Sequence, residues 1–160
     1  AEFTLDLPAE PYLLDAKDEA VFIQAELAKL NIKVNLRMAP FAITSAHMLG
    51  GDYQASLANI MSPGEPTYFL MANFTQGSFM SKTSGNINDP DVTAALKVAF
   101  AETDQEKLKP VYAKLMRSMA DSSYYTWIGY FAAANLWRDR VKNYKVSRGL
   151  TINVHDVALG

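Results

Sequence analysis

The sequence contains no cysteine, which excludes disulfides, thiolate nucleophiles and cysteine-based metal sites. Histidine is scarce: His47 and His155 lie far apart, and neither has a second ligand residue three or four positions away. We therefore expect no metal site, no catalytic histidine and no cofactor. Ser45 and His47 are not a nucleophile–base pair, because residues two apart on a helix point to different faces.

A strong charge of either sign and long apolar runs are also missing. The net charge is -2, so there is no electrostatic basis for binding nucleic acid or an anionic membrane. The apolar runs are short and interrupted by polar residues, and none is predicted to span a bilayer. The chain begins with Ala1 and shows no signal sequence, so we interpret it as a processed chain or a fragment of a longer protein.

The 160 residues suit one domain, and its first part predicts a βαβ unit. Residues 3–7 and 32–38 alternate apolar and polar side chains, as half-buried strands do. Between them Asp15 is predicted to cap a helix, and Asn31 to end it in the left-handed conformation. The helix has an apolar face made of Ala16, Ala20, Ile23, Leu27 and Leu30. Such a unit predicts a parallel sheet.

The stretch from Gly50 to Leu70 is the centre of the predicted fold. Gly50-Gly51 ends a short helix that starts at Pro40, and a buried strand is expected next. The Ser62–Pro66 turn then leads into a helix over residues 67–73. In α/β proteins ligands bind where strands end and helices begin, so this stretch is the candidate ligand site.

The second half predicts two helices between less regular segments. Residues 74–91 are expected to form an exposed loop. A helix begins near Asp89-Pro90, and the Thr103–Glu106 capping box starts another, which Pro110 should kink. Strands are expected over 124–131 and near 141–146. Together these segments predict a mixed, largely parallel sheet flanked by helices.

Two interpretations of the aromatic segment stay open. A core strand accounts for about half of its rings by alternation. Alternatively, one face packs inward and the other offers rings to a ligand. The residues concerned are Tyr124, Tyr125, Trp127, Tyr130 and Phe131.

Several landmarks, in their order and spacing, resemble the second lobe of the extracytoplasmic solute-binding proteins of ABC importers, family 5, the peptide/nickel/opine class. The resemblance covers about residues 3–145. It rests on Phe3-Thr4-Leu5, Ile23–Leu36, Gly51–Ala55, Gly64–Phe69, Asn86–Leu96, Asp104–Leu108 and Val111–Leu115.

The resemblance implies a periplasmic or lipid-anchored receptor with two α/β lobes that close on a small solute or peptide. This chain would be one lobe, residues 1–160, with 146–160 as a return segment toward the missing first lobe. The partners implied are that lobe, the solute and the membrane permease subunits. No enzyme activity is implied.

By the same resemblance, the segment Asn59–Pro63 faces the cleft. Peptide-binding members often carry Trp and Asp where this chain has Asn59 and Ser62. The missing carboxylate favours a less cationic solute, because a buried ammonium needs a counter-charge. The expected ligand-binding residues are Asn59, Ile60, Met61, Ser62, Tyr68 and Trp127.

Two other classes of function remain alternatives. One is an α/β domain of an enzyme whose catalytic residues lie on an absent domain, since α/β folds host many chemistries. The other is an interaction module that uses the aromatic segment as its surface.

Overall fold

A computed structural model describes most of the chain. The described residues are 1–9, 13, 15–59, 66–75, 77–83, 87, 89–123, 125–129, 135–146 and 154–160. The helices are α1 Ala16–Ala28, α2 Phe41–Gly50, α3 Pro66–Phe74, α4 Phe79–Thr83, α5 Pro90–Ala101 and α6 Gln105–Asp121. The strands are β1 Glu2–Pro8, β2 Lys33–Ala39, β3 Ala55–Ser56, β4 Val141–Lys142 and β5 Ala158–Leu159.

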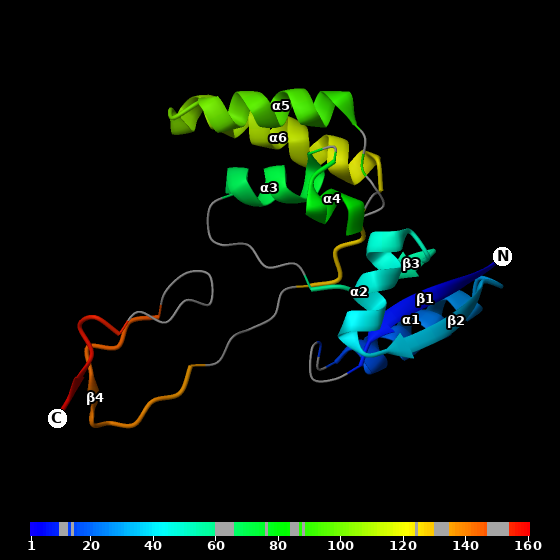
Figure 1. Ribbon diagram of the computed structural model, residues 1–160, viewed down its shortest axis with the longest axis horizontal. Coiled ribbons are helices and arrows are strands. Elements are labelled where there is room, and N and C mark those ends of the chain that lie inside the picture. Colours follow the sequence, from blue (N-terminus) through cyan, green and yellow to red (C-terminus); the bar gives the residue numbers. More distant parts are fainter. Residues whose placement is uncertain are drawn as a thin grey trace.

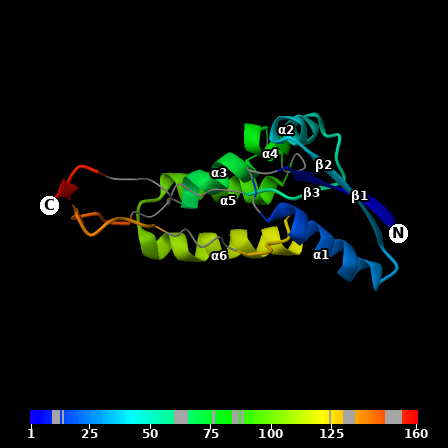
Figure 2. The same ribbon diagram turned by 90° about the horizontal axis from the view of Figure 1, so that it is seen from below.

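The first unit is a parallel sheet in the order β2-β1-β3, with α1 and α2 covering its opposite faces (Figures 1 and 2). β1 and β2 pair along their full length, from Glu2 with Lys33 to Pro8 with Ala39. Leu5 and Leu7 point toward α1, and their core includes Ala16, Ala20 and Val34. The predicted βαβ unit is therefore confirmed, and so is the mixed α/β fold class.

Two predicted helix stops are also confirmed, because each rests on a local conformation. Asn31 has a φ of 57° and Gly51 a φ of 75°. Both values are in the left-handed region that Gly and Asn tolerate best. The expected strand after Gly51 is shorter than predicted, since only Ala55 and Ser56 pair with β1.

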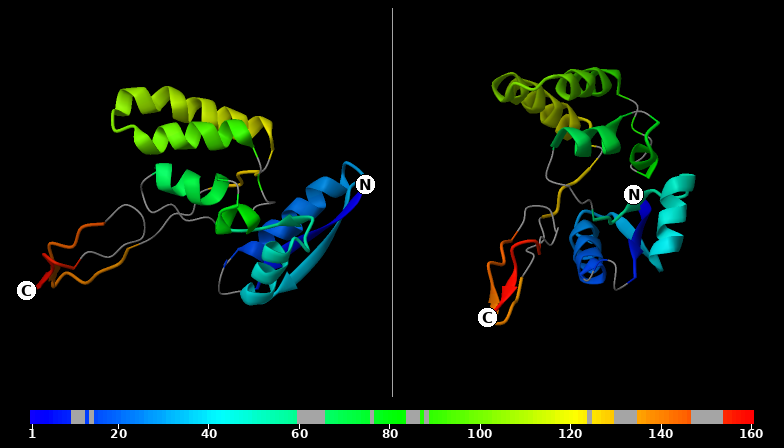
Figure 3. Two further views of the ribbon diagram at one scale, coloured as in Figure 1. Left: turned by 45° about the horizontal axis from the view of Figure 1, so that its top comes forward. Right: turned by 60° about the vertical axis from the view of Figure 1, so that its left-hand side comes forward.

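The second unit consists of α3, α5 and α6, which pack around Phe74 beside the sheet (Figure 3). Its buried residues are Leu70, Phe74, Ile87, Val92, Leu96, Leu115 and Met119. α6 continues on both sides of Pro110. None of the helices in the described part of the chain has the length and apolar character that crossing a bilayer requires.

Three predictions in the second half are wrong. The segment 74–91 contains the helix α4, and within 125–129 the backbone forms no strand. The predicted capping box from Thr103 is replaced by a cap from Asp104, which accepts a hydrogen bond from the Glu106 amide at 2.9 Å. Near 141–146, only Val141–Lys142 forms a strand, and it pairs antiparallel with Ala158–Leu159.

The N-terminus of α5 carries a complete cap, whereas that of α1 does not. Asp89 Oδ1 accepts hydrogen bonds from the amides of Asp91 at 2.9 Å and Val92 at 3.1 Å, and Pro90 follows it. Among the described residues the Asp15 carboxylate caps nothing, contrary to the prediction, because its φ of -101° and ψ of 8° depart from the extended cap conformation.

We expect Asp89→Ala to lower the free energy of unfolding by about 1 kcal/mol. Asp15→Ala is the matched control, because it removes the same group from the same helix position without breaking a cap bond; its effect should stay within about 0.5 kcal/mol. Urea unfolding followed by circular dichroism measures both values. Equal losses in the two variants would show that the Asp89 bonds contribute nothing.

Candidate functional site

The carboxyl ends of β1, β2 and β3 lie along the same edge of the sheet. The strands are parallel, and the Leu57 amide donates to the Asp6 carbonyl at 2.8 Å, so the ladder continues just past β3. Asn59 lies two residues after Leu57 and is half-buried. This is the edge where open α/β sheets bind ligands, and the chain then leads to α3.

A partly buried ion pair supports this edge from within the sheet. Asp6 is 0% exposed and lies directly beside Arg37 on the neighbouring strand. Arg37 Nε donates to Asp6 Oδ1, and Arg37 Nη2 donates to Asp6 Oδ2 at 2.7 Å. The hydrogen bond to Asp6 raises the pKa of the Arg37 guanidinium above its ordinary value. A two-pronged contact of this kind fixes the orientation of the guanidinium.

The same guanidinium holds the segment that leads into β3. Arg37 Nη2 also donates to the Asp52 carbonyl at 2.5 Å, and Arg37 Nη1 lies 3.8 Å from Asp52 Oδ2. The Asp52 amide in turn donates to the His47 carbonyl at 2.9 Å, where α2 ends. Arg37 therefore connects the sheet, the end of α2 and the start of the candidate site.

His47 lies beside this ion pair. Its Nδ1 is 3.9 Å from Asp6 Oδ2 and is buried, with no hydrogen-bond partner in the described part of the chain. His155 is exposed beside Asp156, 3.0 Å away. Across the described residues, no three His, Asp or Glu side chains gather as a metal site requires.

A stack of three rings connects the aromatic segment to α3. Trp127 stacks on Tyr125 with ring centroids 5.6 Å apart, and Tyr125 meets Phe74 edge-on at 5.2 Å. Phe74 is fully buried, whereas Trp127 is 52% exposed. A core ring thus supports an exposed ring through Tyr125. That Trp127 faces a ligand stays a prediction. Tyr124, Tyr130 and Phe131 lie outside the described residues.

The predicted site residues are distributed over three segments. Asn59 follows β3, Tyr68 lies exposed in the first turn of α3, and Trp127 follows α6. Trp127 is brought to α3 through Tyr125 and Phe74. Ile60, Met61 and Ser62 lie outside the described residues, so their placement stays a prediction.

The sequence did not predict the Asp6–Arg37–Asp52 cluster. Asp6 and Arg37 occupy the polar positions of two alternating strands, which are normally solvent-facing. One signal was present: α2 contains no Asp, Glu, Lys or Arg. A helix that covers the face of Asp6 and Arg37 therefore has none of these side chains to pair with them.

No family model and no curated protein matches the sequence. Solved structures do match the fold. NikA from Staphylococcus aureus, in complex with Ni(L-His)2, is 15% identical, with a TM-score of 0.77 over 99% of this chain and 34% of its own. AgaA from A. tumefaciens R10, in complex with agropinic acid, is 26% identical, with a TM-score of 0.65 over 77% of this chain and 25% of its own.

DppA from Helicobacter pylori, an ABC transporter-associated periplasmic binding protein in complex with the peptide STSA, is 20% identical; its TM-score is 0.65 over 77% of this chain and 24% of its own. The chain thus resembles family 5 solute-binding proteins in fold, as the sequence predicted. It spans about a quarter to a third of the length of the solved structures that it matches.

Proposed function

We propose that this chain is one lobe of the solute-binding component of an ABC importer, which captures a small solute between two lobes. The observation that carries the proposal is the match of fold to part of proteins that bind a peptide, agropinic acid or a nickel–histidine complex. The proposed protein is extracytoplasmic and is not an enzyme. Its partners are the other lobe and the permease subunits.

In this proposal the carboxyl edge of the sheet is one wall of the cleft. Asn59, Ile60–Ser62, Tyr68 and Trp127 are the ligand-facing residues. Solute that contacts both lobes shifts an open–closed equilibrium toward the closed form, which the permease then engages. Residues 146–160 are proposed to return toward the other lobe.

The residues of the wall favour an uncharged or anionic solute group at this position. Asn59 and Ser62 carry no charge, and the carboxylates that the structure describes near β3 are committed elsewhere: Asp6 to Arg37, and Asp52 within reach of the same guanidinium. A cationic group held here would lack a counter-charge. An opine or a peptide whose ammonium lies at the other lobe fits this condition.

The test is calorimetric titration of the complete protein with short peptides, opines and the nickel–histidine complex. We expect one class to bind, and this chain alone to bind the same solute at least about 100-fold more weakly, because it lacks the second wall and the desolvation of closure. Equally tight binding by this chain alone would refute the two-lobed arrangement, and no binding by the complete protein would refute solute capture.

We expect Trp127→Ala in the complete protein to weaken solute binding by about 2 kcal/mol, or roughly 30-fold, because an exposed ring on rigid support is a typical binding anchor. Trp137→Ala is the matched control, since Trp137 is also 52% exposed and packs on a tyrosine, Tyr144, at 5.0 Å. Equal solute affinities of the two variants would show that Trp127 does not belong to the binding site.

A further inference from the structure

We propose that His47 and Asp6 form a pH-dependent contact between α2 and β1: the protonated His47 ring donates from Nδ1 to Asp6 Oδ2, and the neutral ring leaves this contact open. Histidine is the side chain whose ordinary change of charge falls between about pH 5 and 8, so the contact responds to modest changes of pH. The inference is independent of the proposed function, because every group that it uses lies in the sheet, in α2 or in the segment between α2 and β3.

The His47 ring lies beside Asp6 with one of its nitrogen atoms unused. Nδ1 is buried, has no hydrogen-bond partner in the described part of the chain, and lies 3.9 Å from Asp6 Oδ2. Asp6 itself is 0% exposed. A neutral ring carries a proton on only one of its two nitrogen atoms, whereas a protonated ring carries one on each. Protonation therefore turns the unused Nδ1 into a donor beside a carboxylate.

The charges around His47 have room for one more cation. Arg37 is shared by two carboxylates, those of Asp6 and Asp52, so one negative charge is left without a counter-charge. The guanidinium opposes a second cation, but the carbonyl groups that end α2 favour one, and His47 lies in the last turn of that helix. Asp6 Oδ2 accepts one hydrogen bond from Arg37 Nη2, and a carboxylate oxygen can accept a second. A protonated ring thus balances the group without displacing Arg37.

The other charged groups of the elements around α2 are engaged or exposed. β1, β2 and α4 pack against α2. At the start of the strands Glu2 Oε1 accepts from Lys33 Nζ at 2.8 Å, and this bond lowers the pKa of the Glu2 carboxyl, so Glu2 stays ionised above about pH 5. Lys82 of α4 is exposed. These groups do not change their charge between about pH 5 and 8.

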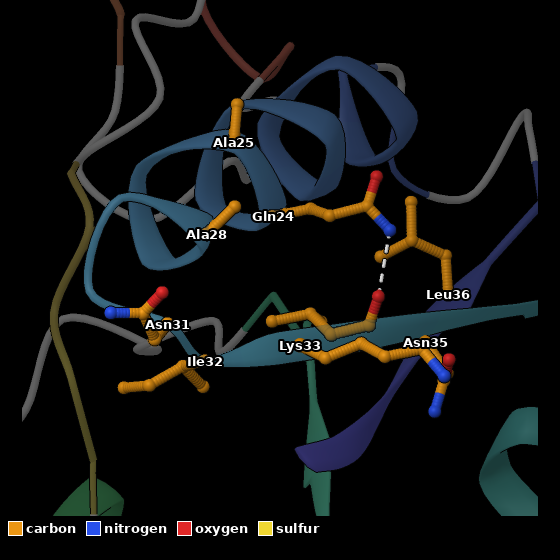
Figure 4. A pocket seen from close by; sticks show the side chains of 9 residues that line it. Gln24, Ala25, Ala28, Asn31, Ile32, Lys33, Asn35 and Leu36 are labelled. Carbon is orange, nitrogen blue, oxygen red and sulfur yellow. Dashed lines mark hydrogen bonds between the residues drawn. The ribbon is translucent and has the colours of Figure 1, made fainter. Parts of the chain in front are cut away.

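The depression on the opposite face of the sheet adds no titrating group either. It has a volume of about 920 Å3 and lies between α1 and β2 (Figure 4). Lys33 is its one charged lining residue, and no Asp, Glu or His lines it. Gln24 Nε2 donates to the Val34 carbonyl there at 2.7 Å, a bond between neutral groups. A pH effect within the sheet and its two helices is therefore assigned to His47.

The His47–Asp6 contact holds the start of the segment that leads to β3. The His47 carbonyl accepts from the Asp52 amide at 2.9 Å, and the Tyr53 hydroxyl donates to the Thr83 carbonyl at 3.2 Å. Only folding brings Asp6 to His47, so a protonated ring gains this bond in the folded chain alone. The added stability is present at acidic pH and is lost as the pH rises and the ring gives up its proton.

Urea unfolding at about pH 5.5 and about pH 8 tests the contact. The unfolding equilibrium constant of His47→Gln, relative to that of the native chain, should be at least about fivefold larger at the acidic pH than at the basic pH. His155→Gln is the matched control, because the His155 side chain is 88% exposed; its ratio should change by less than about twofold. In an Asp6→Asn background, which removes the acceptor charge, His47→Gln should no longer have a pH-dependent effect. Circular dichroism before urea is added establishes that each variant is folded.

Nuclear magnetic resonance of the histidine rings gives a second readout that needs no variant. We expect a slowly exchanging Nδ1 proton of His47 at about pH 5.5, together with stronger protection of the amides from Tyr53 to Leu57 than at about pH 8, after correction for intrinsic exchange rates. Equal pH profiles of His47→Gln and His155→Gln, a pH-dependent effect of His47→Gln that persists in Asp6→Asn, or the absence of the Nδ1 proton at the acidic pH would each overturn the proposal.

Discussion

Replacing Arg37 with methionine is expected to lower the free energy of unfolding by about 3–5 kcal/mol, because it leaves the Asp6 carboxylate buried without its partner. Asp6 is 0% exposed and lies in the middle of the sheet, with Arg37 donating to both of its oxygens. Methionine keeps the apolar stem of the arginine but none of its donors. Urea unfolding monitored by circular dichroism measures the loss.

Replacing the other partner, Asp6→Asn, should lower the free energy of unfolding by less, about 1–3 kcal/mol. The asymmetry follows from exposure: the Arg37 side chain is 37% exposed, so water replaces part of what it loses, whereas water does not reach Asp6. The double variant Asp6→Leu/Arg37→Met should recover much of the loss, because it leaves no charge buried. Additive losses without such recovery would show that the two residues are not coupled.

Arg37→Met should also change the candidate site, in addition to lowering the global stability. Arg37 also holds the Asp52 carbonyl, at the start of the segment that leads through β3 to Asn59. If that bond orders the segment, amides from Tyr53 to Leu57 exchange faster in Arg37→Met than in Asp6→Asn at conditions of equal global stability. This would connect the Asp6–Arg37 ion pair to the geometry of the ligand edge.

Elements with local signals could be predicted from the sequence. β1, α1 and β2 each carry a clear period, and Asn31 and Gly51 each need only their own backbone to end a helix. α4 could not be predicted in this way, because its five residues are too few to show a period. Residues 125–129 have the composition of a strand but no ladder, since pairing is a tertiary event that local propensity does not decide.

The candidate site shows the same division. The strand-to-helix position of Asn59 follows from the βαβ pattern, whereas Asp6 and Arg37 are recognisable in the sequence only as polar residues of two separate alternating strands. Their pairing required the strand register and the cover of α2, and neither is encoded within one segment. The support of Trp127 by Phe74 joins residues more than fifty positions apart, so only the folded chain reveals it.

Phe74→Ala is expected to lower the free energy of unfolding by about 3–5 kcal/mol, because it removes a fully buried ring from the centre of the α3–α5–α6 core. Phe100→Ala, on the exposed side of α5 at 66% exposure, is the matched control and should change stability by no more than about 0.5 kcal/mol. Both values come from urea unfolding. Equal losses would mean that the core does not depend on this ring.

The same variant has a second expected result, at the candidate site. Tyr125 packs edge-on against Phe74 and carries Trp127 on its other side, so loss of the Phe74 ring should release the stack. In a Trp137→Phe background, which leaves Trp127 as the one tryptophan, Phe74→Ala should shift the emission to longer wavelength in the folded state. Phe74→Leu, which keeps most of the volume, should shift it less. An unchanged spectrum in Phe74→Ala would show that Trp127 is held without this core ring.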